Sequence, residues 1–216
     1  MKILVLAPRP LWPSHDGGTV ASLRCISGLA AAGAEVTVLS MKTEKHNSAP
    51  GNTIDSIPDW LSEYRTISVN TKIRPLKLIC NLLFSGHPYD LARFRSPDYS
   101  EALHKILSGN KFDIIHCEGL VFALYLDEIR KYTTAPVSLR AHNLEHRIRK
   151  MMAAVEHSTL RRYYFNNLAG RLKRLEISAT GRFDAIVPLS RPASEWVSAV
   201  AKAKPVILGA SWDVET

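Results

Sequence analysis

At its start the chain reads Met1-Lys-Ile-Leu-Val-Leu-Ala7, and Gly17-Gly18 follow about ten residues after this apolar run. An uninterrupted apolar run is typical of a strand buried on both faces. Apolar residues then recur at helical spacing over 20–30, and Glu35-Val-Thr-Val-Leu-Ser40 has the pattern of a second strand. This predicts a strand–helix–strand unit. Its glycines lie at the start of the helix, where free amides and the helix dipole favour an anion.

The rest of the chain continues to alternate between the two patterns. We expect further strands at 64–69, 112–117, 136–140, 185–189 and 205–208. Helical patterns cover 76–84, 99–107, 120–131, 160–179 and 191–200. The alternation predicts an α/β fold, a Rossmann-like doubly wound parallel sheet of about seven strands with helices on both faces.

Two common phosphate-binding motifs are missing from the first loop. A dinucleotide fingerprint needs Gly-x-Gly-x-x-Gly directly after the strand, and a Walker loop needs Lys and Ser or Thr after its last glycine. The loop that ends in Gly17-Gly18 matches neither pattern. The sequence therefore predicts a phosphate-handling domain of another kind, or an ordinary Rossmann-like turn that happens to contain glycines.

The composition is typical of a soluble globular domain. Of its 216 residues, 46% are apolar and 22% are charged, which is enough for one generous domain. The three cysteines Cys25, Cys80 and Cys117 lie far apart and form no metal-ligand spacing, so we expect no metal site. Reduced thiols and the lack of a signal-like segment favour a cytoplasmic protein.

The net charge of +8 is concentrated in one region. The segment 140–182 carries ten Lys or Arg residues against three Glu residues. Such a surface favours anionic partners, for which we consider nucleotide-sugar phosphates and an anionic membrane surface. The alternative is a helix face that is simply solvated. We expect no nucleic acid partner, because no nucleic-acid-binding module accompanies the charge.

The order of several short motifs resembles the first domain of GT-B glycosyltransferases, especially the retaining family 4. The opening contains Gly17-Gly18, Arg24, Leu29-Ala30, Gly33 and Glu35-Val-Thr-Val38 in the family's order. After the predicted fifth strand, Arg140-Ala-His-Asn-Leu-Glu145 resembles the family's Arg-x-His-Asn-x-Glu, and Arg171-Leu-Lys-Arg-Leu-Glu176 resembles its Arg-Leu-x-x-Leu-Glu. Glu118 stands where the family commonly has a second His, so this position departs from the pattern.

The C-terminal stretch also fits this resemblance. Val206-Ile-Leu-Gly-Ala-Ser-Trp-Asp213 resembles the segment that leads out of the family's first domain. The paired glutamates of the donor-binding domain, seven residues apart, occur nowhere in the chain. We therefore expect residues 1–205 to form the N-terminal, acceptor-side domain and residues 206–216 to begin the interdomain linker. The donor-binding domain is expected to be absent, either truncated or on a separate chain.

The resemblance implies a set of site residues at the carboxyl edge of the sheet, where open α/β sheets bind ligands. His142 is the expected catalytic residue. A His or Asn there can hydrogen-bond a sugar hydroxyl, and glycine amides can approach a phosphate closely. We expect Gly17, Gly18 and His142 to converge on one cleft, and His116 to lie in the core. The expected substrate- or phosphate-binding residues are Gly17, Gly18, Glu118, Arg140, Asn143 and Glu145.

The function implied is transfer of a sugar, of hexosyl type, from a nucleotide-sugar donor to a glycan, lipid-linked or small acceptor, as in polysaccharide biosynthesis. No cofactor is implied. The donor would bind mainly to the missing domain, so the isolated chain should be inactive. A UDP-sugar epimerase-like GT-B protein and a non-catalytic sugar- or nucleotide-binding module remain alternatives. The basic helices of 140–182 suggest peripheral contact with an anionic membrane, at the inner face of the plasma membrane.

Overall fold

The computed structural model describes residues 1–12, 16–44, 58–141 and 143–200. Its strands form one sheet in the order β3-β2-β1-β4-β5-β6, and every neighbouring pair is parallel. The order reverses between β1 and β4, as in a Rossmann-like, doubly wound fold. The strands are β1 (Lys2–Ala7), β2 (Glu35–Lys42), β3 (Glu63–Ser68), β4 (Ile114–Glu118), β5 (Val137–Ala141) and β6 (Ala185–Pro188).

The predicted fold class is confirmed, with six strands in the described residues where about seven were expected. The seventh expected strand, 205–208, lies outside the described residues. So do the expected linker at 206–216 and the domain boundary before it, which stay predictions.

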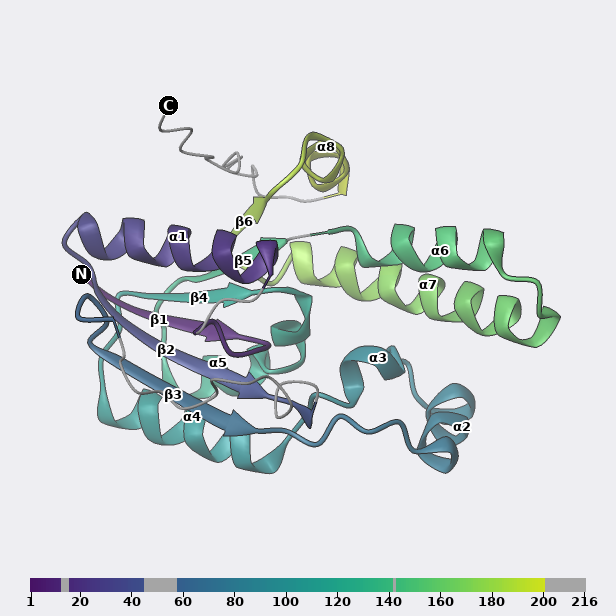
Figure 1. Cartoon of the computed structure of the whole chain (residues 1–216), viewed down its shortest axis with the longest axis horizontal. Coiled ribbons are helices and arrows are strands. Elements are labelled where there is room, and N and C mark those ends of the chain that lie inside the picture. Colours follow the sequence, from purple (N-terminus) through teal and green to yellow (C-terminus); the bar gives the residue numbers. More distant parts are fainter. Residues whose placement is uncertain (13–15, 45–57, 142, 201–216) are drawn as a thin grey trace.

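Helices cover both faces of the sheet (Figure 1). On one face lies α1 (Gly17–Ala31), and on the other lie α4 (Pro97–Gly109) and α5 (Leu126–Tyr132). Two shorter helices, α2 (Pro75–Phe84) and α3 (Tyr89–Ala92), extend past the carboxyl ends of the strands. The remaining helical elements are the 3-10 helix η2 (Leu120–Leu124), α6 (Glu145–Val155), α7 (Thr159–Thr180) and α8 (Arg191–Val200).

The strand β1 illustrates why the sheet is buried on both sides. Successive side chains of a strand point to opposite faces. Ile3 and Val5 pack with Ile26 of α1 on one face, whereas Leu4 and Leu6 join a second cluster on the other. All four β1 side chains are at most 2% exposed. An uninterrupted apolar strand therefore becomes the central strand between two hydrophobic cores.

The second core is built around an aromatic cluster. Tyr99 of α4 is fully buried, and its ring centroid lies 5.2 Å from that of Tyr125 and 6.1 Å from that of Phe122. The Tyr99 hydroxyl donates a hydrogen bond to the Leu39 carbonyl of β2, at 3.1 Å. One side chain thus joins the sheet, α4 and the segment that follows β4.

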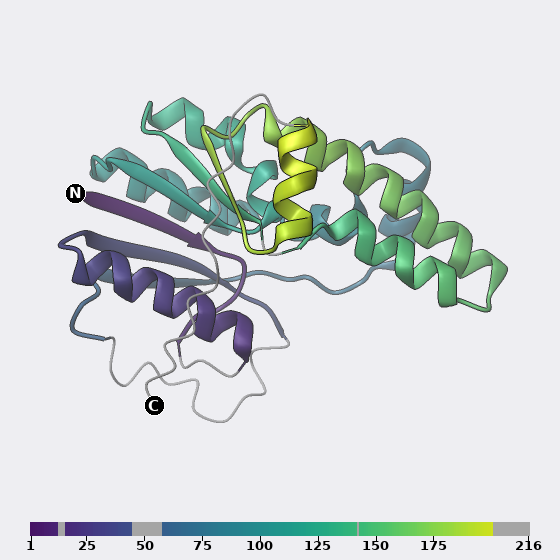
Figure 2. The same cartoon turned by 90° about the horizontal axis from the view of Figure 1, so that it is seen from above.

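The helices α6 and α7 form a hairpin that extends beyond the carboxyl edge of the sheet, and they run side by side in Figures 1 and 2. Near its middle, α7 contacts the end of α2. There the buried Arg171 guanidinium donates hydrogen bonds to the carbonyls of Asn81, at 2.9 Å, and Leu82, at 2.5 Å. Arg171 therefore caps the C-terminal carbonyls of a neighbouring helix, a role that polar side chains commonly perform at helix ends.

Candidate functional site

The loops after β1, β4 and β5 meet where the strand order reverses. Gly119, which follows β4, has a φ of +111°, a conformation that favours glycine. A Cβ atom on Gly119 would lie 4.0 Å from Cγ of Pro8, in the loop after β1. Gly119 also lines a small cavity of about 60 Å³ together with Ala141 and Asn143. This edge of the sheet is where ligands of open α/β folds bind.

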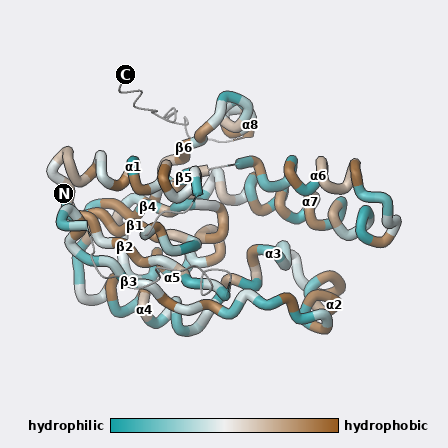
Figure 3. The backbone as a smooth tube through the Cα atoms, viewed as in Figure 1, coloured by the Kyte–Doolittle hydropathy of each residue, from teal (hydrophilic) through white to brown (hydrophobic). Residues whose placement is uncertain are grey.

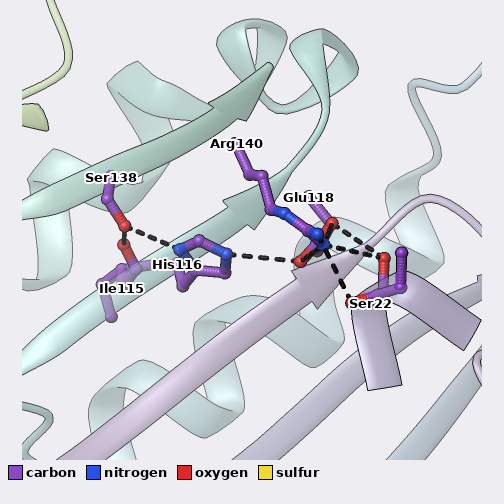
Figure 4. A network of polar contacts seen from close by, with 7 residues as sticks. Ser22, Ile115, His116, Glu118, Ser138 and Arg140 are labelled. Carbon is purple, nitrogen blue, oxygen red and sulfur yellow. Dashed lines mark hydrogen bonds and ion pairs between the residues drawn. The ribbon is translucent and has the colours of Figure 1, made fainter. Parts of the chain in front are cut away.

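A buried polar network lies beneath these loops, between β4, β5 and α1 (Figure 4). Arg140 at the end of β5 donates from Nη1 to both carboxylate oxygens of Glu118, at 3.0 and 3.2 Å. Ser22 of α1 donates to Glu118 Oε2 at 3.0 Å, and Arg140 Nη2 donates to the Ala21 carbonyl at 3.3 Å. Glu118 is 1% exposed and Arg140 is 4% exposed. The ion pair therefore connects β4, β5 and the first turns of α1.

The network extends further along the sheet through His116. Its Nε2 lies 3.3 Å from Glu118 Oε1, and its Nδ1 lies 2.8 Å from the Ser138 hydroxyl of β5. His116 is 8% exposed, so it lies in the core as expected. Glu118 and Arg140 are both buried and join the ends of β4 and β5 to α1. Their direct contact with a phosphate or sugar stays a prediction.

The glycines predicted to bind phosphate lie at the N-terminus of α1, which is already capped by the chain itself. Asp16 Oδ1 accepts a hydrogen bond from the Thr19 amide at 2.9 Å, and its Oδ2 pairs with Arg9 Nη1 at 2.7 Å. A Cβ on Gly18 would lie 2.3 Å from Nη2 of Arg9, whereas one on Gly17 would meet open space. Gly18 makes room for the arginine, whereas no atom of the described residues lies within 4 Å of the corresponding position on Gly17.

We expect Asp16→Ala to lower the free energy of unfolding by about 1 kcal/mol, since an N-cap is lost. Asp16→Asn keeps a capping oxygen, so it should lower the free energy of unfolding by only a few tenths of a kcal/mol.

The pH dependence separates these two variants. Partial burial alone would raise the pKa of Asp16, but the Thr19 amide and the Arg9 charge hold it below the ordinary 3.8. The carboxylate's extra stabilisation is therefore present above about pH 4 and is lost as the pH falls through the lowered pKa. Urea unfolding of both variants from neutral to acidic pH checks this. A wild-type advantage over Asp16→Asn that persists in strong acid would contradict it.

The remaining predicted residues lie in the loop between β5 and α6. Asn143 is exposed, Glu145 begins α6, and both line the same small cavity as Gly119. The expected catalytic residue, His142, lies outside the described residues, as does its expected convergence with Gly17 and Gly18. The roles of all these residues in binding and catalysis stay predictions.

One buried pair beside this cavity was not singled out as a site from the sequence. Nδ1 of His146 contacts the Glu176 carboxylate, which also accepts from the His146 amide at 3.3 Å. Burial raises the pKa of Glu176, and the His146 contact offsets part of that rise. The His146 ring lies 5.2 Å from Trp196 of α8. Glu176 thus supplies a cap for the first turn of α6. The Arg171-to-Glu176 motif was the only signal for it.

The described residues contain no cluster of three or more His, Cys, Asp or Glu side chains that could hold a metal ion. No helix among them is long and apolar enough to span a bilayer. The three cysteines are free, and Cys80 is exposed.

No protein-family model matches the chain, and no curated protein sequence does. Solved structures do match it. Sucrose-phosphate synthase from Thermosynechococcus elongatus has a TM-score of 0.59 at 17% identity, over 97% of this chain and 48% of its own. A UGT from Phytolacca americana, in complex with UDP-2-fluoro-glucose and pterostilbene, has a TM-score of 0.55 at 11% identity, over 100% of this chain and 54% of its own. A UGT from Medicago truncatula, in complex with UDP-glucose, has a TM-score of 0.51 at 14% identity, over 96% of this chain and 51% of its own.

The fold is that of one half of a GT-B glycosyltransferase. The chain spans about half the length of these matched structures. At such low identities the likeness concerns the fold, and function has to be argued from the site.

Proposed function

We propose that the chain is the acceptor-side domain of a glycosyltransferase, of the retaining family 4 type. The observation that carries the proposal is the match of almost the whole chain to about half of several sugar-transferring enzymes. The motifs quoted from the sequence support it, because they recur in the order that the family has. The complete enzyme would move a hexosyl group from a nucleotide-sugar to a glycan, lipid-linked or small acceptor, in polysaccharide biosynthesis.

Within this proposal the edge of the sheet has two layers of residues. Gly17, Gly18, Asn143 and Glu145 would contact phosphate or acceptor, with His142 as the catalytic residue. Glu118 and Arg140, buried beneath them, would hold the loops in place. Catalysis of glycosyl transfer depends on positioning and on stabilising charge that develops on the leaving phosphate, so a rigid support for the loops is useful.

We also propose a cytoplasmic location with contact to an anionic membrane through the basic segment 140–182. Several of its ten cations pair with acids of the chain: Arg140 with the buried Glu118, Arg149 with Asp90 at 2.8 Å, and Arg182 with Asp127 at the surface. The exposed cations that support the proposal are Arg147, Lys150, Arg161, Arg162, Lys173 and Arg174. They lie on α6 and α7, the hairpin that extends past the sheet edge.

The proposed domain role predicts binding without turnover. Purified 216-residue chain, incubated with UDP-glucose and oligosaccharide acceptors, should release no UDP above the buffer control. In amide-resolved NMR, acceptor sugars should shift the amides of Gly17, Gly119 and Asn143, whose loops surround the edge. UDP release by the chain alone would overturn the acceptor-domain proposal. So would acceptor-induced shifts confined to the opposite edge of the sheet, near Glu35 and Asp113.

A further inference from the structure

A second, larger cavity opens at the carboxyl ends of β2 and β3. Its volume is about 720 Å³, and it is lined by the strand ends, by α2 and α3, and by the first turn of α4. None of the described residues of the candidate site lines it. Six cationic side chains line it: Lys42, Lys72, Arg74, Lys77, Arg93 and Arg95.

The positive charge of this basic cavity is only partly neutralised by its own acids. The two acids that line it are Glu44, which pairs with Lys72 at 3.1 Å, and Asp98. In the part of the chain that the structure describes, no carboxylate lies within ion-pair distance of Lys42, Arg74, Lys77 or Arg95. A concave surface with such an excess of one charge concentrates ions of the opposite sign.

One cation of the cavity is anchored by hydrogen bonds, and a helix N-terminus adds further positive charge. Arg93 is anchored by hydrogen bonds to the carbonyls of Asp90, at 3.2 Å, and Thr71, at 3.3 Å. The first turn of α4, capped by Ser96, also borders the cavity and adds the positive end of a 13-residue helix. The cavity therefore combines one fixed guanidinium with the positive end of a helix.

The helix beside the cavity is apolar on its free side. None of the ten residues of α2 is buried. Leu76, Ile79 and Leu83 recur at steps of three and four, so they share one side of the helix, and they are 75%, 53% and 66% exposed. Phe84, at the end of α2, is 85% exposed. Figure 3 shows α2 as a predominantly hydrophobic segment away from the sheet. Lys77 and Asn81 of the same helix face the cavity.

We propose that this cavity binds the phosphate headgroup of an anionic phospholipid, with the exposed apolar side of α2 in the acyl region of the bilayer. A soluble anion would use the cations but would leave the apolar side of α2, with Leu76, Ile79 and Leu83, in water. A lipid surface satisfies both features, since interfacial helices place apolar residues below the headgroups and cations at their level. The inference adds a membrane-binding surface distinct from the α6–α7 hairpin of the proposed function, and binding to vesicles is measured without any sugar transfer.

The test is flotation of the 216-residue chain with phosphatidylcholine vesicles, with and without phosphatidylglycerol. The chain should float only with the anionic vesicles. Each Lys or Arg near an anionic surface contributes about fivefold in partitioning, so Arg74→Glu/Lys77→Glu should weaken binding by tenfold or more. Leu76→Ser/Leu83→Ser, on the apolar side of α2, should weaken it to a similar extent. All four side chains are exposed, so circular dichroism should confirm unchanged folding.

Two further variants and a soluble probe separate the other outcomes. Lys105→Glu/Lys111→Glu makes the same change in net charge at the far end of α4 and should keep binding within about threefold of wild type, as expected for charges beyond the screening length. Equal losses in this control and in the cavity variant would overturn the proposal in favour of net charge alone.

Other outcomes would point to another surface or ligand. If Arg161→Glu/Arg162→Glu abolishes flotation and the cavity variant does not, the contact is the α6–α7 hairpin. Binding of glycerol phosphate to the cavity without any flotation would show that the ligand is a soluble phosphate. Absence of both would leave the cavity without an anion ligand and overturn the inference.

Discussion

Arg140→Ala is expected to lower the free energy of unfolding by about 3–5 kcal/mol, because it removes the buried guanidinium that pairs with the Glu118 carboxylate. The side chains of Arg140 and Glu118 are 5% and 1% exposed, so solvent does little to screen the lost interaction. Ser22 and His116 would still contact the carboxylate but carry no fixed positive charge. Guanidinium chloride unfolding, followed by circular dichroism, measures the loss.

The double variant Glu118→Gln/Arg140→Met is the informative companion. Replacing both members of a buried pair with neutral groups of similar volume is often close to neutral, so it should recover to within about 2 kcal/mol of wild type. The exposed pair Arg191–Glu195, at 3.1 Å, supplies a surface reference, and Arg191→Ala should cost at most about 1 kcal/mol. A double variant as unstable as Arg140→Ala would contradict the unpaired buried charge as the cause of the loss.

Tyr99→Ala is expected to cost about 3–5 kcal/mol of folding stability, the range for deleting a large buried ring. The ring packs against Phe122 and Tyr125 and has no solvent exposure. Its removal would therefore leave a cavity that bulk water does not reach. Tyr99→Phe keeps the ring and removes only the hydrogen bond to Leu39, and it should cost about 1–2 kcal/mol. Equal losses for the two variants, by urea unfolding, would contradict the packing argument.

The same tyrosine gives a pH signature. Burial raises the pKa of Tyr99 well above its ordinary value of 10, so the folded chain keeps the phenol neutral after the unfolded chain has ionised. The stabilisation is complete below about pH 10 and is lost as the pH rises beyond it. Tyr99→Phe should therefore lose stability less steeply than wild type at alkaline pH.

The parallel sheet could be predicted from the sequence because its signal is local. Ile3 to Ala7 form an uninterrupted apolar run, and only a strand buried on both faces uses such a run at that length. Other details depend on partners distant in the chain. The predicted helix 120–131 is a 3-10 helix, η2, followed by α5, and the Tyr125 side chain between them donates a hydrogen bond to the distant Phe94 carbonyl, at 2.7 Å. The helix α6 was not predicted, since its first turn is capped by Glu176, thirty residues away.

The candidate site shows the same division. The motif around Arg140 and Glu145 lies at the carboxyl edge of the sheet, as expected, because strand ends can be predicted from local patterns. The sequence allows Arg140 either to bind a phosphate or to pair with an acid, and its partner Glu118, 22 positions earlier on the adjacent strand, is identified only by the fold. The basic cavity had no sequence signal at all. Its cations come from the ends of β2 and β3, from α2 and from the approach to α4, and only the fold brings them together.

The hydrogen bonds from Arg171 to the C-terminal turn of α2 affect how easily this helix unfolds. A ten-residue helix without a buried side chain has little stability of its own in water, since isolated helices of that length are marginal. Its C-terminal turn is held by one guanidinium from α7. We therefore infer that α2 opens locally, as a unit, at a free-energy cost far below that of the sheet, and that its amide hydrogens exchange early. If these hydrogen bonds from Arg171 break, α2 should unfold locally, so hydrogen exchange in α2 depends on the position of α7.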